Sequence, residues 1–382
     1  MSGVAQRSRL AALIGDRWYL RGFLGAAFLA LLLTVVIVWV QEGGSATDQR
    51  VALTFLVNLV AVIGLQTFIG NSGVISFGHV AFIGLGAYCS ALLTTPPETK
   101  ELTTLISNAP GFLLHAEMSF LPATLVAVAF VAVFAGLVGI VFVRMSGAAA
   151  AIGTLSLLIV VRVVLGNWEQ VTRGPKTFFG VPAYTTVWWA LGWAVVAIIV
   201  ARLFRESGIG LRLRASRTDE LASAAVGVDI KRARWFAWVL SAMMAAVSGA
   251  LYAHLILAFA PQQFYLDLTF TLIVMAIVGG TSVSGAVIGA AGISLVQEVL
   301  RRGESGFALG PIQIDEAFGL TTLVLGLLVL ATVILRPGGL LGRWELDELL
   351  ARAWRRIPRS GGGAAPPAGV ADAAAGGPPA GV

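Results

Sequence analysis

The chain has 382 residues, of which 57% are hydrophobic and only 12% charged, and its mean hydropathy is +0.87. So apolar a composition excludes an ordinary soluble protein and indicates an integral membrane protein. The formal net charge of +6 comes from dispersed basic residues, which does not favour a nucleic-acid binder. A single cysteine, Cys89, and three widely separated histidines exclude an intrachain disulfide and predict no metal site.

The apolar segments predict an all-α polytopic bundle of eight to ten transmembrane helices, because one span needs about 20 mostly apolar residues. Ten candidates follow in chain order, at residues 22–40, 51–69, 78–94, 120–143, 147–166, 186–204, 235–258, 267–281, 284–300 and 316–335. The eighth is short and is separated from the ninth by a glycine-rich junction. These two segments could therefore form one bent hairpin.

The domain organisation follows from these spans and from the composition of the two ends. We expect a cytoplasmic leader at 1–21, a transmembrane domain at 22–342 with a large cytoplasmic loop at about 205–235, an amphipathic cytoplasmic helix at 343–357 and a disordered tail at 358–382. The amphipathic helix would lie either on anionic lipid or against a partner subunit. The tail is rich in Gly, Ala and Pro and has no hydrophobic periodicity.

The basic residues predict the orientation of the chain. With ten spans and the N-terminus inside, 19 of the 26 Lys and Arg residues lie in cytoplasmic segments, 6 lie in outer segments, and Arg162 lies within a span. Short cytoplasmic loops accumulate such residues, so both termini are expected in the cytoplasm. A cleaved signal peptide ending near Gly44-Ser45-Ala46 is the alternative, but the basic leader and the first apolar run are both long for one.

Two Gly/Ser-rich breaks interrupt the apolar pattern. Non-helical backbone at membrane depth is tolerated only where protein or water surrounds it, so the breaks could line a substrate pathway. Their candidate pathway residues are Asn71, Ser72, Gly73, Ser76, His79, Gly280, Thr281 and Ser282. The helix beginning near Ser76 would present free N–H groups suited to a carboxylate. Turn formation and close helix packing are the other explanation, and Gly78, Gly84, Gly285 and Gly289 are predicted to serve packing.

Ionisable side chains inside predicted spans need an explanation, because their exposure to lipid is costly. Arg162 lies a few residues from the end of its span, and we expect it to reach toward the outer surface. His79 is expected to bond to backbone groups freed by the first break rather than to substrate.

The loop Arg205–Phe236 predicts a short helix outside the bilayer. Ser216 or Thr218 could cap its start, Asp219 and Glu220 fall in its first turn, and Gly227 could close its end. Leu221, Ala224, Ala225 and Val228 would then form a small apolar knob. Such a rigid projection suits a membrane protein that receives movement from another protein.

The sequence contains no motif for a nucleotide motor or for hydrolysis. No Walker A loop, nucleophile elbow or dinucleotide-binding glycine set is present, so we expect a transport subunit and not an enzyme. A secondary transporter would need ionisable relays deep in its spans, whereas the acidic residues here lie in loops or near span ends. A channel and a lipid-modifying membrane enzyme remain further alternatives, although a convergent set of catalytic groups is not visible.

Several stretches resemble one family of membrane proteins. Gly64–Leu93, Gly208–His254 and Ala276–Ala290 resemble the permease subunits of branched-chain amino-acid ABC transporters of the LivM branch, and Ile334–Gly342 is similar to the ending of that branch. Together these stretches cover most of residues 50–342. In contrast, Val171–Pro182 departs from the Thr-Gly-Gly pattern usual in that region.

The resemblance implies a role for the cytoplasmic loop. It implies that Thr218, Asp219, Glu220, Leu221, Ala222, Ala225, Gly227 and Asp229 form the loop that couples to ATPase subunits. The implied partners are a second, related permease, two ATP-binding-cassette subunits, a periplasmic or lipid-anchored solute-binding protein and the lipid of a bacterial inner (plasma) membrane. The chain itself would bind no cofactor, because ATP and Mg would be used by the ATPases. Branched-chain or other small apolar amino acids are the expected substrates, with urea or short amides as the alternative.

Overall fold

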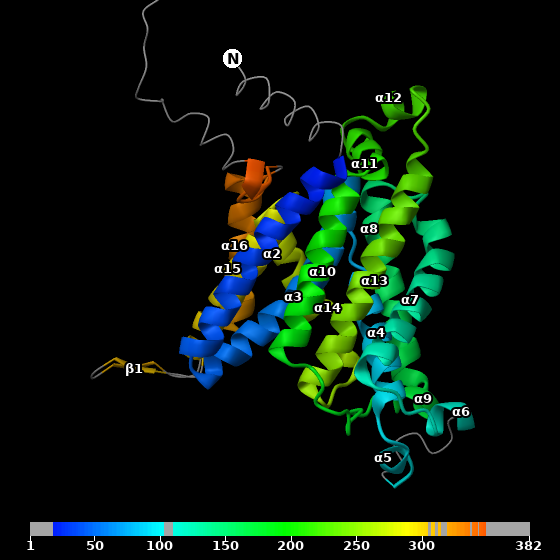
Figure 1. Ribbon diagram of the computed structural model, residues 1–382, viewed down its shortest axis with the longest axis vertical. Coiled ribbons are helices and arrows are strands. Elements are labelled where there is room, and N and C mark those ends of the chain that lie inside the picture. The colour runs from blue at the N-terminus through cyan, green and yellow to red at the C-terminus, as the bar shows by residue number, and fades with distance from the viewer. Residues whose placement is uncertain are drawn as a thin grey trace, which may run out of the picture.

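The computed structural model describes residues 18–102, 110–304, 307–309, 312–314, 319–336, 338–342 and 344–348. Within them the fold is a bundle of long helices that run roughly along one axis (Figure 1). Helices α11 (Gly208–Thr218) and α12 (Glu220–Ala225) cover one end, which we call the α12 end. The opposite end, called the α5 end, carries α5 (Pro97–Leu102), α6 (Gly111–Leu114) and α9 (Glu169–Thr172). Most of the predicted leader and all of the predicted tail lie outside the described residues.

Eight of the described helical segments are long and apolar enough to cross a membrane. They comprise α2 (Trp18–Gly43), α3 (Ala46–Ser72), α7 (Phe120–Phe142), α8 (Gly147–Asn167), α10 (Val187–Glu206), α13 (Ile230–Ile256), α14 (Leu266–Gly279) with the turn η1 (Pro261–Gln263), and α15 (Val283–Glu304). Two shorter apolar helices are α4 (His79–Thr94) and α16 (Leu320–Leu335). The eight long helices agree with the lower end of the predicted range of eight to ten spans. α14 and α15 are two packed helices, joined by a break at Gly280–Ser282.

One element was not expected from the sequence. The antiparallel hairpin of β1 (Phe307–Leu309) and β2 (Ile312–Ile314) pairs Phe307 with Ile314 at the α5 end. The all-α prediction therefore holds for the bundle but not for this connection between α15 and α16.

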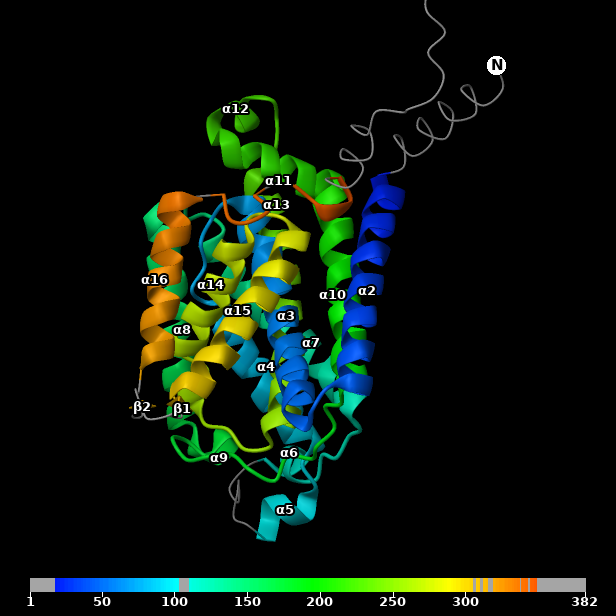
Figure 2. The same cartoon turned by 90° about the vertical axis from the view of Figure 1, so that its left-hand side faces the viewer.

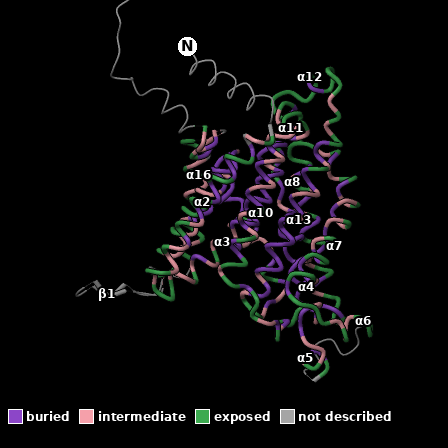
Figure 3. Tube along the Cα trace, in the orientation of Figure 1, coloured by how far each residue is buried: buried purple, intermediate pink, exposed green. Residues whose placement is uncertain are grey.

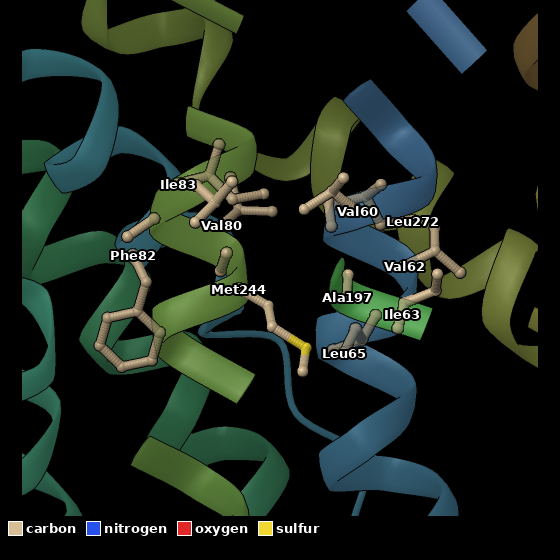
Figure 4. Packing of buried hydrophobic residues seen from close by; sticks show 14 of the residues in the cluster. Val60, Val62, Ile63, Leu65, Val80, Phe82, Ile83, Ala197, Met244 and Leu272 are labelled. Atoms are coloured by element: carbon tan, nitrogen blue, oxygen red, sulfur yellow. The ribbon is translucent and has the colours of Figure 1, made fainter. Parts of the chain in front are cut away.

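The core is built around α13, which packs against α3, α4 and α7. Most residues of α3, α4 and α13 are buried, whereas α7 and α8 have many exposed apolar residues (Figure 3). Met244 of α13 reaches toward the Val60–Leu65 stretch of α3, with Phe82 of α4 on the other side of α13 (Figure 4). α2 lies outside this core and packs along α10 (Figure 2).

Glycines bring neighbouring backbones into contact at the α4–α13 crossing. A Cβ atom at Gly86 would lie 2.5 Å from the Ala246 carbonyl oxygen, and one at Gly249 would overlap the Ile83 carbonyl oxygen. Helix association in lipid depends on van der Waals packing, for which such close approach is needed. The crossing of α4 and α13 therefore requires glycine from both helices.

The four glycines predicted to serve packing also lie at close approaches. A Cβ at Gly78 would lie 2.8 Å from the Thr154 oxygen of α8, and one at Gly84 would lie 3.2 Å from Phe264. At Gly285 and Gly289 a Cβ would overlap carbonyl oxygens of α14. Gly78, Gly285 and Gly289 leave no room for a larger residue without movement of the backbone, whereas at Gly84 only neighbouring side chains would have to shift.

The substitution Gly249→Ala is expected to lower the free energy of unfolding by about 1–3 kcal/mol, since overpacking forces backbone shifts of that cost. Gly192→Ala in α10 is the matched control, because a Cβ there meets no atom within 4 Å and alanine favours helix. Thermal unfolding of both variants in detergent checks this. An apparent midpoint for Gly249→Ala that equals that of Gly192→Ala would contradict the close crossing.

Arg162 does reach toward one end of the bundle. Its guanidinium carbon lies 4.2 Å from the ring centroid of Tyr265, which directly precedes α14. A cation held over an aromatic face near a helix end is partly compensated for its removal from water. The expected direction of this side chain, toward a surface of the bundle, is consistent with this contact.

Candidate functional site

The predicted projection at the α12 end is a short helix with a cap at each end. Asp219 is the N-cap, because its Oδ1 accepts a hydrogen bond of 2.9 Å from the Ala222 N–H. Gly227 follows the helix with a positive φ of 84°, a conformation that glycine adopts without strain. The Asp229 carboxylate then caps α13 by accepting from the Arg232 N–H at 3.0 Å. The three residues thus fix the start and end of the turn between α11 and α13.

The expected cap by Ser216 or Thr218 is wrong. Both residues lie in α11, and the Ser216 hydroxyl donates to the Leu213 carbonyl within that helix. Asp219 takes the position instead, because α11 continues to Thr218 and the chain turns only there. A carboxylate is also the more favourable group at a helix N-terminus.

α12 presents an apolar surface to solvent. Leu221 is 85% exposed and Val226 is 80% exposed, and the alanines Ala222, Ala224 and Ala225 are exposed beside them. Val228, predicted as part of this knob, is half-buried, and Val226 takes its place. We call the exposed set Leu221, Ala222, Ala224, Ala225 and Val226 the α12 knob.

The projection is tied to the bundle by Arg234 of α13. One of its nitrogen atoms, Nη2, lies 2.6 Å from the Glu220 carboxylate, and Nη1 donates to the carbonyl oxygens of Val143 and Met145. Arg234 is buried, whereas the Glu220 side chain is half exposed. These bonds join α12 both to α13 and to the connection between α7 and α8. Movement of α12 would therefore be passed to three helices.

The first Gly/Ser break lies between α3 and α4. Gly73 ends α3 in the left-handed conformation (φ 73°), and residues 73–78 run without helical structure before α4 begins at His79. The Asn71 amide donates to the Thr67 carbonyl and the Ser72 hydroxyl donates to the Phe68 carbonyl. Most of the polar groups of this break are thus bonded to the chain itself.

His79 bonds to hydroxyl groups rather than to backbone. Its Nδ1 lies 2.8 Å from the Ser76 Oγ and its Nε2 lies 2.8 Å from the Ser241 Oγ of α13. The expected bond to backbone freed by the break is therefore wrong, because serine side chains from two elements occupy both ring nitrogens. The imidazole is buried and packs edge-on against Trp238.

The second break joins α14 to α15 and is covered by the segment after α16. The Thr281 N–H donates to the Gly342 carbonyl at 2.9 Å, and the Leu340 N–H donates to the Val278 carbonyl at 2.8 Å. Gly280 (φ 102°) approaches Gly338 and Gly342 so closely that no Cβ would fit. Ser282 is buried and caps α15, since its Oγ accepts from the Gly285 N–H. The predicted pathway residues of this break thus lie under the C-terminal strap, which we define as residues 338–342 and 344–348.

The two breaks lie side by side at the α12 end. The Gln66 side chain donates to the Gly280 carbonyl at 2.7 Å, and Gly70 and Thr281 line one cavity of about 760 Å³. Two arginines from the α10–α11 segment donate to the same breaks: Arg217 to the Gly70 carbonyl at 3.2 Å and Arg205 to the Thr281 carbonyl at 2.7 Å. Desolvation by burial, followed by the like charge of Arg205, lowers the pKa of the Arg217 guanidinium.

The carboxylate of Glu345 holds the strap in place. The residue is 1% exposed, and its oxygens lie 3.1 Å from Arg202 and 2.9 Å from Arg205 of α10. The N–H groups of Val283 and Ser284 donate to the same carboxylate at 3.0 Å each. Burial alone raises the pKa of this carboxyl, but the two arginines and the bonds from Ser284 hold the pKa below its ordinary value. The side chain therefore joins the strap, α10 and the start of α15.

The sequence alone did not single out Glu345, Arg202 or Arg205. Glu345 belongs to the stretch read as an amphipathic helix, of which residues 346–348 are helical and most of the rest lies outside the described residues. One signal could have indicated a buried ion pair. Glu345 is an acidic residue that shortly follows a Pro-Gly-Gly sequence in a region otherwise rich in arginine.

The described residues contain no group of three or more His, Cys, Asp or Glu side chains placed to hold a metal ion. The described fold is that of a multi-pass membrane protein, with eight helices long and apolar enough to cross a membrane and a capped apolar projection at one end.

The comparisons with known proteins agree with this class. Residues 49–333 match the family described as the permease component of the branched-chain amino acid transport system. The high-affinity branched-chain amino acid permease protein LivM of Salmonella typhimurium is 25% identical over 360 residues, which covers 82% of this chain and 74% of that protein. LivM of Escherichia coli is also 25% identical, with the same coverage. A probable LivH permease of Methanocaldococcus jannaschii is 24% identical over 52% of this chain and 66% of its own length.

No solved structure matches the chain. Because the family match covers well over half of its residues, the chain belongs to the branched-chain amino acid transport permease family.

Proposed function

We propose that this chain is one transmembrane permease subunit of an ATP-driven (ABC) importer in a bacterial inner membrane. Its substrates would be branched-chain or other small apolar amino acids, the solutes named for its relatives. The observation that carries the proposal is the α12 knob, an apolar surface on a capped helix at the end where the arginines gather. Lipid can cover the exposed apolar side chains of the spans, whereas an exposed apolar patch on a short helix beyond their ends favours a protein partner.

The proposed partner at the α12 knob is an ATP-binding-cassette subunit, two of which would serve a pair of related permeases. ATP and Mg would be bound and used by those subunits, and a solute-binding protein would deliver solute at the α5 end. This requires the α12 end to be cytoplasmic. The clustering of Arg144, Lys231 and the arginines of 202–217 at that end supports the orientation, because cytoplasmic loops accumulate basic residues.

Arginine bonds provide a route from the knob to the solute path. α12 is joined through Arg234 to α13 and to the α7–α8 connection. α11, which directly precedes α12 in the chain, donates through Arg217 to the end of α3, and Arg205 at the end of α10 donates to the α14–α15 break. We infer that closure of the ATPases displaces α12 and α11 together, and that these bonds carry the displacement to both breaks.

The test is uptake by the reconstituted complex. Proteoliposomes with both permeases, both ATPases and the loaded binding protein are expected to accumulate leucine only with ATP inside the compartment that the ATPases face. Uptake that continues when the ATPases are left out would favour a secondary transporter or a channel. Urea or a short amide taken up in place of leucine would change the substrate but keep the class.

A further inference from the structure

A polar groove runs between the α5-end halves of α3 and α15, away from both Gly/Ser breaks. It has a volume of about 520 Å³, and its lining includes Arg50, Thr54, Asn58, Ser294, Gln297 and Arg301. Asn58 lies one residue before the middle of α3 (Ala46–Ser72), and Ser294 lies near the middle of α15 (Val283–Glu304). The groove therefore extends from the α5 end to about the middle of both helices.

Several polar groups of this groove lack partners within the described part of the chain. The side chains of Arg50, Asn58 and Gln297 form no hydrogen bond or ion pair there, and the Ser294 Oγ is buried without a partner. Elsewhere in the spans, hydroxyl groups such as Ser156 donate to their own helix. An amide side chain facing hydrocarbon would lose its bonds to water at a cost of several kcal/mol. The groove must therefore face water or another polar group rather than lipid.

The charges in the groove are of both signs. Glu298, at the same end, is 11% exposed and pairs with Arg301 at 2.8 Å and with Arg302 at 2.7 Å. Arg50 remains without such a pair among the described residues. A solute with one negative and one positive group could place its carboxylate near Arg50 and Arg301. Its ammonium group could then lie near Glu298 and the side-chain oxygen of Asn58. A solute of single charge would meet a like charge at one of these positions.

We propose that this groove is the first part of the solute route and binds the zwitterionic head of an amino acid. The proposal rests on the proposed function, from which it takes the direction of transport. Thr54, Asn58 and Ser294 continue the polar surface from the α5 end toward the middle of the bundle. A second permease subunit, packed against the open side, would complete the wall of the groove.

Thiol labelling tests whether the groove is water-filled. Cys89 is the one cysteine of the chain, so its replacement by serine gives a background for Asn58→Cys, Gln297→Cys and the control Ser156→Cys, which is exposed near the middle of α8. In the assembled complex, a membrane-impermeant methanethiosulfonate added from the α5 side is expected to label positions 58 and 297 but not 156. Leucine delivered by the binding protein should slow the labelling. Equal labelling at 58 and 156, or none at 58 and 297, would overturn the proposal.

Uptake tests whether solute uses the groove. Asn58→Leu and Gln297→Leu are each expected to lower ATP-dependent uptake of leucine by about tenfold. The charged groups of the solute would have no polar partner beside the introduced apolar side chain. Asn58→Ser, which replaces the amide by a polar hydroxyl, should keep most of the uptake and shows that the position tolerates exchange. Unchanged uptake by Asn58→Leu and by Gln297→Leu would overturn the proposal that solute passes through this groove. If the wild-type complex shows no ATP-dependent uptake, the proposed function fails. Slower labelling of the cysteines at positions 58 and 297 in the presence of leucine would still show whether the groove binds the amino acid.

Discussion

Replacement of Glu345 by alanine is expected to cost about 3–5 kcal/mol of unfolding free energy, the largest effect of any single substitution considered. The variant leaves Arg202 and Arg205, both nearly fully buried, without their shared counter-charge. It also removes the acceptor for the Val283 and Ser284 N–H groups at the start of α15. The apparent midpoint of thermal or denaturant unfolding in detergent measures this loss.

Asp347→Asn is the matched control, because Asp347 also pairs with Arg202 but its side chain is 33% exposed. Arg202 keeps Glu345 in this variant, and a partly exposed pair contributes less than a buried one, so Asp347→Asn should unfold much closer to the wild type than Glu345→Ala does. Equal midpoints for Glu345→Ala and Asp347→Asn would contradict the role given to the buried carboxylate. Glu345→Gln keeps the size of the side chain and separates loss of charge from loss of volume.

The contribution of the Glu345 carboxylate to the free energy of unfolding depends on pH, and the direction of this dependence can be predicted. The folded-state pKa of Glu345 lies below its ordinary value of 4.5. The stabilisation by its carboxylate is therefore fully present above pH 4.5 and is lost as the pH falls through the lower folded-state pKa. As the pH falls below 4.5, the wild-type protein should therefore lose a stabilisation that Glu345→Gln does not have at any pH. Unfolding midpoints of the two proteins over this pH range measure the difference.

The double substitution Leu221→Asp and Val226→Asp is expected to lower ATP-dependent uptake by more than about tenfold while leaving the fold intact. Buried apolar anchors at interfaces commonly contribute about 2 kcal/mol or more each, whereas exposed positions affect folding by about 0.5 kcal/mol or less. Both side chains are at least 80% exposed in the isolated chain. Uptake in proteoliposomes and co-purification of the ATPases with the permease measure the two consequences.

Leu221→Met with Val226→Ile provides the control, since both positions are highly exposed and the exchange keeps the α12 knob apolar. It should retain uptake and bind the ATPases. If the double variant still binds the ATPases and transports at the wild-type rate, the α12 knob does not couple this chain to them. An unfolding midpoint that falls with uptake would instead indicate a structural role for Leu221 or Val226.

The spans and the projection could be predicted because their signals are local. An apolar run of about 20 residues specifies a membrane helix by length and composition alone. α12 was located from neighbouring turn and cap residues, and Gly227 does end it in the conformation that favours glycine. The cap itself was misassigned because Ser216, Thr218 and Asp219 are all suitable residue types. Only the length of α11 decides between them.

The residues that hold the α12 end together could not be predicted, because their partners are distant in the sequence. Glu345 and Arg202 are separated by more than a hundred positions, and Gln66 bonds to a carbonyl in the break before α15. The Gly/Ser breaks were located from composition, yet composition could not indicate that residues after the last span would cover one of them. The assignment of pathway roles to Asn71, Ser72, Gly73, Ser76, His79, Gly280, Thr281 and Ser282 stays a prediction.

The strap at residues 338–342 and 344–348 has a consequence for biogenesis. A nascent chain inserts its helices into the membrane in order, but the amide groups at the start of α15 acquire their carboxylate only after residue 345 has left the ribosome. A message cut short after α16 would therefore yield a polypeptide with every span of the native protein but without the strap that completes the α12 end. Quality-control proteases would meet such a product as a substrate, even though every span had been correctly inserted.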